Sequence, residues 1–497
     1  MSRETDRGEE GLAHEPSSSP RFVGPFHPFL RYRPLIDDWD AFVQALSRPL
    51  PTCIWAHPQR ISPQDLRRIL EEEGFALTPI PWYPGAFRVE QGEGLGRTWA
   101  YKVGLFHIQE EVSLLPVAVL APRPGERVLD MAAAPGNKTV QMALRMNNRG
   151  TVVANDMDIG RMRALRHVLE RMGAINVSTT IYNGSNLPSA MGAFDRVLVD
   201  APCSCEGTSR KNPEVLGLCG LSVSLEHQRL QIAMLRKAVL LTRPGGRILY
   251  STCTYAPEEN EVVVDAVLRE FGERVRLLPA RVPRFSATPG LRQWAGHEFH
   301  PDMPLSLRIW PHHHDTGGFF VALLEKRTEG WKRVPPRPPT LKDLAAYTVV
   351  DPRPWLGYLE ERFGIPEERF AEFYLIQRSR KTLHLVNKDH RPPLRPSPDA
   401  IGMAFLHVTA RPPKLTTAAA LVFGRWATRH VVPLDPDQRD AYLARQTVTL
   451  RREQTERCTR GGFVIVTYRD HPLGMGLYRP GNPPRLESLF PKGWMRG

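Results

Sequence analysis

Two cysteines and an aspartate lie where predicted strands end in the middle of the chain. Asp200 and Cys203 belong to DAPCSC, which follows the apolar run FDRVLV, and Cys253 belongs to STCT, which follows GGRILY. Parallel α/β sheets place their active sites at the carboxyl ends of strands. A single buried cysteine is most often a small apolar filler. Two thiols at strand ends, each beside polar or turn-forming residues, instead favour covalent catalysis by a thiolate.

Methylation of carbon 5 of a cytosine ring needs the groups that this set contains. That carbon is too weak a nucleophile to attack a sulfonium methyl group unaided, and a thiolate that adds to carbon 6 activates it. An acid near ring nitrogen 3 stabilises the adduct, and a base later removes the carbon 5 proton so that the thiol can leave. One aspartate and two cysteines can fill these three roles.

A second group of residues has the pattern of a nucleotide site. The run ERVLDMA predicts a strand, and AAAPGNKT predicts a small-residue loop leading into a helix, whose first turn offers backbone amides to a ligand. Asp156 ends the next predicted strand, where such sheets hold ribose hydroxyls, and Asn183 ends the third, near the expected adenine edge. The loop matches neither GxGxxG nor a Walker motif. The loop instead predicts a site for a single adenosine with a short tail. The alternative for the loop is a tight βα connection without a ligand, and the alternative for Asn183 is an ordinary Asn-Gly turn.

The region from Pro124 to Lys326 alternates between short β-branched runs and amphipathic stretches, which is typical of a doubly wound α/β sheet. The predicted strands are ERVLDMA, GTVVAND, NVSTTIYN, FDRVLVDAP, GGRILYSTC and GFFVALLEK. The predicted helices are KTVQMALRMN, IGRMRALRHVLERMG, the stretch 225–242 and NEVVVDAVLREF. Such a sheet brings the small-residue loop and both cysteine loops to one edge.

The segments on either side of this sheet predict further domains. Upstream, LPTCIWAH and FALTPIPW predict strands, and ISPQDLRRILEEEG between them predicts a helix. Downstream, the stiff Pro-rich segment RVPPRPPT precedes helical patches and short strands such as FVIVTYRD. We expect a disordered tail at 1–20, an α+β domain at 21–100, the main α/β domain at 101–330, a linker at 331–340 and a basic domain at 341–497.

The formal net charge of +13 is concentrated in the last third of the chain. Residues 331–497 hold 28 Lys and Arg against 16 Asp and Glu, whereas residues 1–330 hold 38 against 37. A nearly neutral body with a basic module is typical of a protein that binds nucleic acid through phosphates. For the basic module, a PUA-like RNA-binding domain is the candidate.

Composition excludes several other classes of protein. No apolar run reaches the 18 residues of an ordinary membrane-spanning helix, and the N-terminus lacks the apolar core of a secretory signal. The 6 cysteines include no CxxC spacing, which argues against a disulfide framework and a structural zinc site. We therefore expect a cytoplasmic protein without a metal. The remaining cysteines are interpreted as structural: Cys53, Cys219 and Cys458.

Two further polar segments have ordinary structural explanations. His312–His314 resembles a metal-binding tract, but no carboxylate or cysteine spacing accompanies it, so a surface loop is expected. Arg210 and Lys211 follow the first cysteine loop, and a solvated charge pair is the default expectation there. Contact with phosphates of a substrate strand is the alternative.

Several motifs together resemble the Sun/Nop family of RNA cytosine-5 methyltransferases. They occur in the family's order over about residues 100–326, and the paired PCS and TCT motifs are specific. The long C-terminal extension is similar to bacterial small-subunit rRNA methyltransferases of the RsmF type. The segments that carry the resemblance are GLFHIQEEVSLLP, DMAAAPGNKT, AND with Arg161, DAPCSCEGTSRKNP, RPGGRILYSTCTYAPEENE, DTGGFFVALLEK and the terminal LFPKGW.

The resemblance implies a Rossmann-like class I methyltransferase domain and a role for each matching residue. It implies that Cys253 is the nucleophile, that Cys203 assists release of the methylated product, and that Asp200 contacts the target cytosine near the cofactor. The residues that would surround S-adenosylmethionine are Ala132, Ala133, Ala134, Pro135, Gly136, Asn137, Lys138, Asp156, Arg161, Asn183 and Asp200.

The chain departs from the family pattern at three positions. Cys205 stands where a glycine usually follows the PCS motif, Asn183 stands where an aspartate is usual, and Glu111 stands where a small residue is expected. Cys205 is interpreted as tolerated rather than catalytic.

The expected function is methylation of cytosine carbon 5 in RNA, with 16S rRNA as the favoured substrate and a monomeric enzyme. A tRNA cytosine-5 methyltransferase is one alternative, and a non-catalytic rRNA-binding assembly factor on the same fold is another. A DNA cytosine methyltransferase is a weaker third, because the cysteine of TCT would then have no stated purpose. The intact set of Asp200, Cys203 and Cys253 favours the enzyme.

Overall fold

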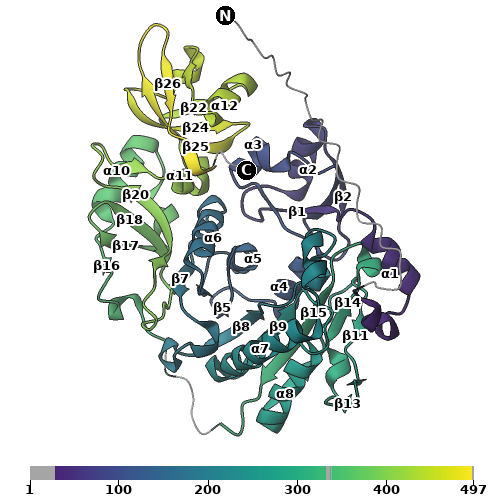
Figure 1. Ribbon diagram of the computed structural model, residues 1–497. Helices are drawn as coiled ribbons and strands as arrows, with labels where there is room; N and C mark the ends of the chain where they lie inside the picture. Colours follow the sequence, from purple (N-terminus) through teal and green to yellow (C-terminus); the bar gives the residue numbers. More distant parts are fainter. Residues whose placement is uncertain (1–27, 332–335, 337, 495–497) are drawn as a thin grey trace, which may run out of the picture.

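The computed structural model describes residues 28–331, 336 and 338–494. The expected tail at 1–20 lies outside these residues, as does half of the expected Pro-rich linker at 331–340. Figure 1 shows the central sheet with its helices in the middle, the N-terminal sheet on one side and the C-terminal sheets on the other.

The central sheet contains all six strands predicted for it. Five are parallel: β5 (Arg127–Asp130), β6 (Thr151–Asp156), β7 (Val177–Ile181), β8 (Phe194–Asp200) and β9 (Thr242–Thr252). Their spatial order is β7-β6-β5-β8-β9, and β15 (Phe319–Lys326) follows antiparallel to β9. Because the order reverses beside β5, a crevice for ligands is expected at the carboxyl ends of these strands. The predicted doubly wound α/β class is confirmed.

Short strands extend this sheet at both edges. On one side lie β10 (Val275–Leu278), β11 (Thr288–Pro289) and β14 (Leu307–Ile309), while β12 (Gln293–Trp294) and β13 (His297–Glu298) form a separate hairpin. On the other side, β19 (Ala400–Ile401) pairs with β7. The C-terminal part of the chain thus supplies a strand to the central sheet.

Helices cover both faces of the central sheet with separate apolar layers. One layer packs α4 (Leu115–Leu120), α5 (Asn137–Arg145) and α6 (Ile159–Arg171) against the sheet, and the other packs α7 (Leu221–Leu241) and α8 (Glu261–Phe271). Each fully buried leucine in these layers contributes about 1.5–3 kcal/mol to folding. Because both faces are covered, β5, β6 and β7 are buried almost along their whole length, instead of alternating between buried and exposed positions.

The N-terminal region contains an antiparallel sheet and a separate helical segment. The sheet has the order β2-β3-β1-β4. The segment of η1 and α1 packs on the central domain, where Phe29, Tyr32 and Phe42 surround Tyr255 and Trp310. The elements are η1 (Leu30–Leu35), α1 (Trp39–Leu46), β1 (Thr52–Ala56), α2 (Pro63–Glu72), β2 (Ala76–Pro79), β3 (Ala86–Glu90), α3 (Trp99–Lys102) and β4 (Phe106–Ile108).

The C-terminal region contains two five-stranded sheets. The first comprises β16 (Thr348–Val349), β17 (Phe373–Ser379), β18 (Thr382–Asn387), β20 (Met403–His407) and β21 (Lys414–Leu415), with α10 (Arg353–Phe363) and α11 (Thr417–Phe423). The second comprises β22 (Val431–Pro433), β23 (Thr447–Thr449), β24 (Gly462–Tyr468), β25 (His471–Arg479) and β26 (Arg485–Ser488), with α12 (Pro436–Leu443).

One apolar core joins the N-terminal sheet to both C-terminal sheets. It runs from Ile54 and Trp99 through Phe363 and Leu385 to Tyr468. The rings of Trp99 and Tyr468 meet edge to face, with centroids 5.1 Å apart. The N-terminal sheet and the two C-terminal sheets therefore stabilise one another directly.

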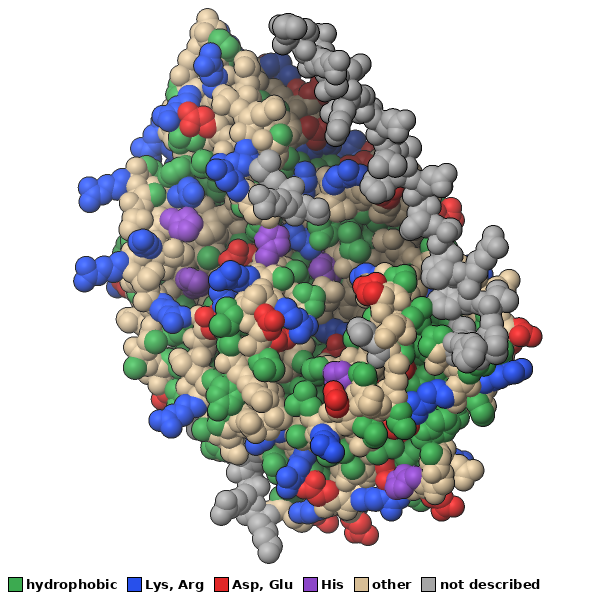
Figure 2. Space-filling view, in the orientation of Figure 1, with side chains coloured by type: hydrophobic (Ala, Val, Ile, Leu, Met, Phe, Trp, Pro, Cys, Tyr) green, Lys and Arg blue, Asp and Glu red, His purple; other side chains and the backbone are tan. Residues whose placement is uncertain are grey.

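The surface of the C-terminal region is rich in cations. Figure 2 shows Lys and Arg side chains projecting from its left edge, over this region, whereas Asp and Glu are more frequent along the lower edge. Among the described residues, no helix combines the length and apolar character that crossing a membrane requires.

Candidate active site

The two cysteines at the strand ends lie side by side. The parallel register of β8 and β9 sets Asp200 opposite Ser251, so the loops that follow these strands leave the sheet together. The Sγ atoms of Cys203 and Cys253 are 3.4 Å apart. Both side chains are half-buried, so each thiol is shielded and still reachable by a substrate.

Hydrogen bonds tie the two cysteine loops to one another. The hydroxyls of Ser204 and Thr254 are 2.7 Å apart, and the Gly207 amide donates to the Cys253 carbonyl at 2.8 Å. The Ser204 amide also donates to Glu259 Oε2 at 3.0 Å. Because these bonds cross between the loops, they hold the thiols at their short separation.

Glu206 connects these loops to the N-terminal segment. Its carboxylate accepts hydrogen bonds from the Tyr32 hydroxyl at 2.9 Å, from the Thr254 hydroxyl at 3.0 Å and from the Tyr255 amide at 3.3 Å. Burial raises the pKa of Glu206, although these donors oppose the shift. Sequence reasoning missed Glu206 and Tyr32, because nothing in the local pattern indicates that two segments 174 residues apart meet.

Cys205 adds a third thiol to the pair. Its Sγ lies within 4.8 Å of the Sγ atoms of both Cys203 and Cys253, and it donates to the Cys203 carbonyl at 3.3 Å. Its backbone φ is +60°, in the left-handed region. Glycine adopts that conformation at no steric cost, which explains why a glycine is usual at this position in the related motif.

The three thiols influence one another's ionisation. Hydrogen bonds from Cys203 and Cys253 lower the pKa of the Cys205 thiol. The Cys205 and Cys253 hydrogen bonds, with burial, raise the pKa of Cys203. The Cys203 hydrogen bond lowers the pKa of Cys253, but Cys205 and burial outweigh it, so the net shift is upward. A single negative charge shared by the cluster is therefore favoured over two.

Asp200 is held from two directions. Its Oδ1 accepts a hydrogen bond from the Ser251 hydroxyl at 2.7 Å, and its Oδ2 pairs with Lys138 Nζ at 2.7 Å. Burial alone would lower the pKa of Lys138, but the pairing with Asp200 outweighs it and raises that pKa. Lys138 is the second residue of α5, so this ion pair links the helix that follows the small-residue loop to the end of β8, just before the first cysteine loop.

The small-residue loop is shaped by contacts with the neighbouring strand. The Ala133 amide donates to the Asn155 carbonyl at 2.8 Å, and the Ala134 amide donates to Asp156 Oδ2 at 3.1 Å. Arg161 lies 3.7 Å from the same carboxylate oxygen and donates to the Ala134 carbonyl. Gly136 has a φ of +111°, and a Cβ there would lie 3.2 Å from Leu165, so this turn requires glycine.

The polar side chains around this loop fit S-adenosylmethionine. Asp130 Oδ1 is buried at the end of β5 without a hydrogen-bond partner among the described residues. Burial raises the pKa of Asp130 to about 7, and the hydrogen bond from Thr139 opposes the shift. The ammonium group of a methionine moiety would supply the missing donor, because a buried acceptor without a partner is costly. Asp156 and Asn183 lie at neighbouring strand ends, where a ribose and an adenine bind in such sheets.

Three predicted or unusual residues have structural explanations. Asn183 Oδ1 accepts from the amide and hydroxyl of Ser185 and so begins a helical turn at 184–186. Asn137 is half-buried, and its Oδ1 lies 3.0 Å from His107 Nε2. Glu111 is buried and accepts from Trp82 Nε1 at 2.8 Å and from Arg88 Nε at 2.5 Å, which accounts for a carboxylate at a position where a small residue is usual.

The expectation for Arg210 was wrong. Its side chain is 1% exposed, and it pairs with Asp315 at 2.7 Å and donates to the Thr316 and Pro49 carbonyls. A guanidinium enclosed in this way is neither solvated nor available to an RNA phosphate. Lys211, the other member of the expected pair, is exposed.

The expected loop at His312–His314 was also wrong. These residues form a short helix, α9 (Pro311–His314). His312 Nε2 and His313 Nε2 lie 2.9 Å and 3.2 Å from Asp37 carboxylate oxygens, and both imidazoles are largely buried. The tract therefore anchors the segment before α1 to the central domain.

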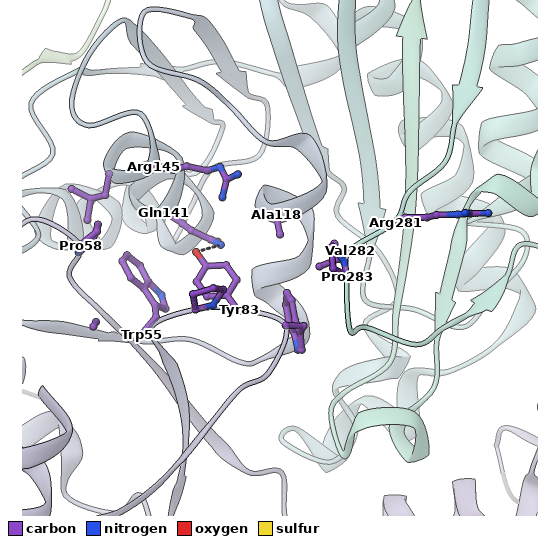
Figure 3. A pocket seen from close by; sticks show the side chains of 13 residues that line it. Trp55, Pro58, Tyr83, Ala118, Gln141, Arg145, Arg281, Val282 and Pro283 are labelled. Carbon is purple, nitrogen blue, oxygen red and sulfur yellow. Dashed lines mark hydrogen bonds between the residues drawn. The ribbon is translucent and has the colours of Figure 1, made fainter. Parts of the chain in front are cut away.

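A cavity of about 430 Å³ lies apart from the thiols, between the N-terminal sheet and α5 (Figure 3). Trp55, Tyr83 and Ala118 form its apolar walls, and Gln141 Nε2 donates to the Tyr83 hydroxyl at 3.0 Å across it. None of the residues predicted for catalysis or cofactor binding lines this cavity. The chemistry is therefore assigned to the strand ends and not to this pocket.

Comparisons with protein families match most of the chain. The model for the 16S rRNA methyltransferase RsmB/F matches residues 117–325. The N-terminal domain of the 16S rRNA methyltransferase RsmF matches residues 30–111, and the methyltransferase RsmF PUA domain matches residues 429–496. The PUA match covers the second C-terminal sheet, in agreement with the candidate fold.

Individual relatives agree with these matches. The ribosomal RNA small subunit methyltransferase F of Shewanella oneidensis is 31% identical over 468 residues, covering 91% of this chain and 92% of its own. The tRNA (cytosine(49)-C(5))-methyltransferase of Pyrococcus abyssi is 36% identical over 293 residues, covering 59% of this chain and 93% of its own.

Solved structures confirm the fold of the central part. A methyltransferase homolog protein from Pyrococcus horikoshii is 34% identical, with a TM-score of 0.52, covering 57% of this chain and 90% of its own. NSun6 from Pyrococcus horikoshii, solved with SFG, is 22% identical with a TM-score of 0.51, covering 59% of this chain and 94% of its own. The chain belongs to the RsmF family of 16S rRNA methyltransferases.

Proposed function

We propose that this enzyme transfers a methyl group from S-adenosylmethionine to carbon 5 of a cytosine in 16S rRNA. The observation that carries the proposal is the 3.4 Å separation of the Cys203 and Cys253 thiols, with Asp200 at the end of the adjoining strand. Two thiols and a carboxylate in one crevice match the chemical needs of cytosine carbon 5, which must be activated and later deprotonated.

Cys253 is the proposed nucleophile. Its thiolate adds to carbon 6 of the target ring, forming a carbon–sulfur bond and moving electron density to carbon 5. Cys203 lies close enough to exchange a proton with Cys253. Its proposed role is to assist elimination of the thiolate from the methylated ring. Asp200 contacts the cytosine near ring nitrogen 3, and Lys138 and Ser251 hold its carboxylate in place. Cys205 has no step in this mechanism.

The cofactor supplies an electrophilic methyl group when it is bound. The residues proposed to hold it are Ala132 to Lys138, Asp156, Arg161, Asn183 and Asp200. Asp130 is proposed in addition, because its buried Oδ1 has no hydrogen-bond partner among the described residues. Asp156 accepts a hydrogen bond from the Ala134 amide and forms an ion pair with Arg161. The small side chains at 132–134 leave room for the ligand to approach the backbone.

A basic cluster on the first C-terminal sheet is proposed to bind RNA phosphates. The turn between β17 and β18 carries Arg380 and Lys381, and the Lys381 carbonyl accepts from the Val408 amide at 3.0 Å. Val408 begins the loop that carries Arg411, and Lys414 follows at the start of β21. These four cations form no ion pair with any residue that the structure describes. Unpaired cations on one surface favour a polyanionic partner.

Each domain of the chain has its own proposed role. Residues 21–100 form an auxiliary RNA-binding domain, residues 101–330 form the methyltransferase domain, and residues 341–497 bind RNA, with the enzyme acting as a monomer in the cytoplasm. The favoured substrate is rRNA because the S. oneidensis relative covers nearly the whole chain, including the C-terminal sheets. The tRNA enzyme of P. abyssi matches only 59% of the chain, and a tRNA substrate is the second candidate.

Bisulfite sequencing tests the proposal. RNA from a strain lacking the enzyme should lose methylation at one or more cytosines of 16S rRNA, and the wild-type gene should restore it. A gene carrying Cys253→Ala should not. Loss of methylation in tRNA alone would favour the second candidate, and unchanged methylation in both RNAs would contradict the proposal.

A further inference from the structure

The catalytic crevice holds one more thiol than the proposed reaction uses. The Sγ atoms of Cys203, Cys205 and Cys253 all lie within 4.8 Å of one another, and the three side chains are half-buried, so a small solute can reach them. Cys205 occupies a backbone position with a φ of +60°, where glycine would fit without strain. A cysteine there needs an explanation that backbone geometry does not provide.

Three sulfur atoms at these separations fit a thiophilic metal ion. A tetrahedral zinc ion with Zn–S distances of about 2.3 Å sets its sulfur ligands about 3.8 Å apart. The Cys203–Cys253 separation of 3.4 Å is slightly shorter than this, and the other two sulfur–sulfur separations are within 4.8 Å. Small side-chain rotations would therefore bring all three sulfurs onto one ion, with water at the fourth position.

We propose that Cys203, Cys205 and Cys253 bind zinc and that the bound ion reversibly blocks the enzyme. Binding replaces the protons of the thiols, which pass to solvent, and it involves no oxidation. The nucleophile is then a metal ligand and cannot add to the cytosine ring. The inhibitory consequence rests on the proposed methyl transfer, whereas the metal site itself rests only on the thiol geometry.

The surroundings of the cluster favour such an ion. Three thiolates on a divalent zinc ion carry one net negative charge. The Lys138 ammonium, although paired with Asp200, lies near Cys253 and lowers the electrostatic cost of that charge. Sulfur ligands select zinc and other soft ions over magnesium or calcium. Cys203 and Cys253 alone supply two ligands, fewer than the three protein ligands of catalytic zinc sites. Cys205 therefore supplies the third protein ligand that a zinc site needs.

A second group of side chains in the described residues has metal-ligand spacing and must be distinguished. Asp37, His312 and His313 place their ligand atoms within 4.8 Å of one another. This group contains no sulfur. A cadmium ion bound at the cysteine cluster produces thiolate-to-metal charge-transfer absorption, whereas one bound at the histidines does not.

The experiment titrates the reduced full-length protein with cadmium and follows the charge-transfer absorption. Zinc affinity is then measured by competition with a chromogenic chelator. We expect one ion per chain in the wild type, and an affinity at least about tenfold lower, or about 1.4 kcal/mol weaker, in Cys205→Gly. Cys219→Ser is the matched control, because Cys219 lies in the same region but donates to the Val215 carbonyl outside the cluster.

The same variants are then tested for inhibition. Zinc should inhibit methyl transfer by the wild type, a chelator should restore activity, and Cys205→Gly should stay active at zinc concentrations that stop the wild type. Equal zinc affinity in the wild type and Cys205→Gly would overturn the inference, as would cadmium binding without charge-transfer absorption. If no methyl transfer is detected at all, the proposed function fails, and the metal titrations still decide the site.

Discussion

The Sγ atoms of Cys203 and Cys253 lie 3.4 Å apart although 50 residues separate them in the chain. The parallel pairing of β8 with β9 and the hydrogen bonds between their following loops produce this proximity. A second relationship, the ion pair of Lys138 with Asp200, joins the same crevice to the helix that follows the small-residue loop.

Substitution of the two cysteines should have different effects. Cys253→Ala should abolish methyl transfer from labelled S-adenosylmethionine, because no thiolate remains to activate the ring. Cys203→Ala should retain attack but slow release, so a protein–RNA adduct should survive on denaturing gels. An adduct that forms with Cys253→Ala instead would show that the roles of the two thiols are reversed.

Removal of the Lys138 charge should impair catalysis more than folding. In Lys138→Met, Asp200 loses its ion pair and its fixed orientation, and we expect kcat to fall about a hundredfold, the scale of a positioned acid–base group. Lys138→Arg keeps a cation and should retain much of the activity. Thermal denaturation of both variants provides the folding control. Wild-type kcat in Lys138→Met would show that the ion pair is dispensable.

Cys205→Gly should shift the pH dependence of activity. The Cys205 thiol raises the pKa of Cys253 in the wild type, so its removal should lower that pKa. A larger fraction of Cys253 is then thiolate at a given pH, and the acid limb of the kcat/KM profile should move to lower pH. The rate of alkylation of Cys253 against pH gives an independent measurement. A shift to higher pH would contradict the assigned direction.

The basic cluster on the first C-terminal sheet should control the salt dependence of RNA binding. The triple substitution Arg380→Ala, Lys381→Ala and Arg411→Ala should weaken binding and reduce the slope of log K against log salt by about 2 to 3. Three arginines that are paired with carboxylates serve as the matched control: Arg353, Arg451 and Arg479.

Substitution of these three paired arginines with alanine should change the slope much less. Equal slopes in the two triple variants would exclude a special role for the cluster. Deletion of the whole C-terminal region is a poorer test, because it would expose the core shared by Trp99 and Tyr468.

The contact of Tyr32 with Glu206 should stabilise the cysteine loops. Tyr32→Phe removes a donor to a buried carboxylate, and we expect the free energy of unfolding to fall by about 1–3 kcal/mol. Tyr182→Phe, at a tyrosine that is 41% exposed, is the control and should be nearly neutral. Denaturant titration measures both variants. Equal stability of the two would show that the contact contributes nothing.

Local sequence determined the catalytic elements of this protein. The six predicted strands of the central sheet and the four predicted helices are present, because apolar periodicity and turn residues act over a few neighbouring positions. The motifs around Cys203, Cys253 and the loop at 132–138 lie at the ends of these strands, where a parallel sheet gathers them without further information. The sequence therefore sufficed to identify the candidate chemistry and the family.

Tertiary structure alone decided how charged and polar residues far apart in the chain are used. Arg210 is enclosed by Asp315 and by the carbonyls of residues 48, 49 and 316, and Lys138 pairs with Asp200. The local sequence around each of these two cations looks the same as that around a solvated surface charge. The C-terminal region contains two sheets, and its core is continuous with the N-terminal sheet. Such contacts depend on which faces meet after folding, and the periodicity of a short segment does not identify the segment that it will contact.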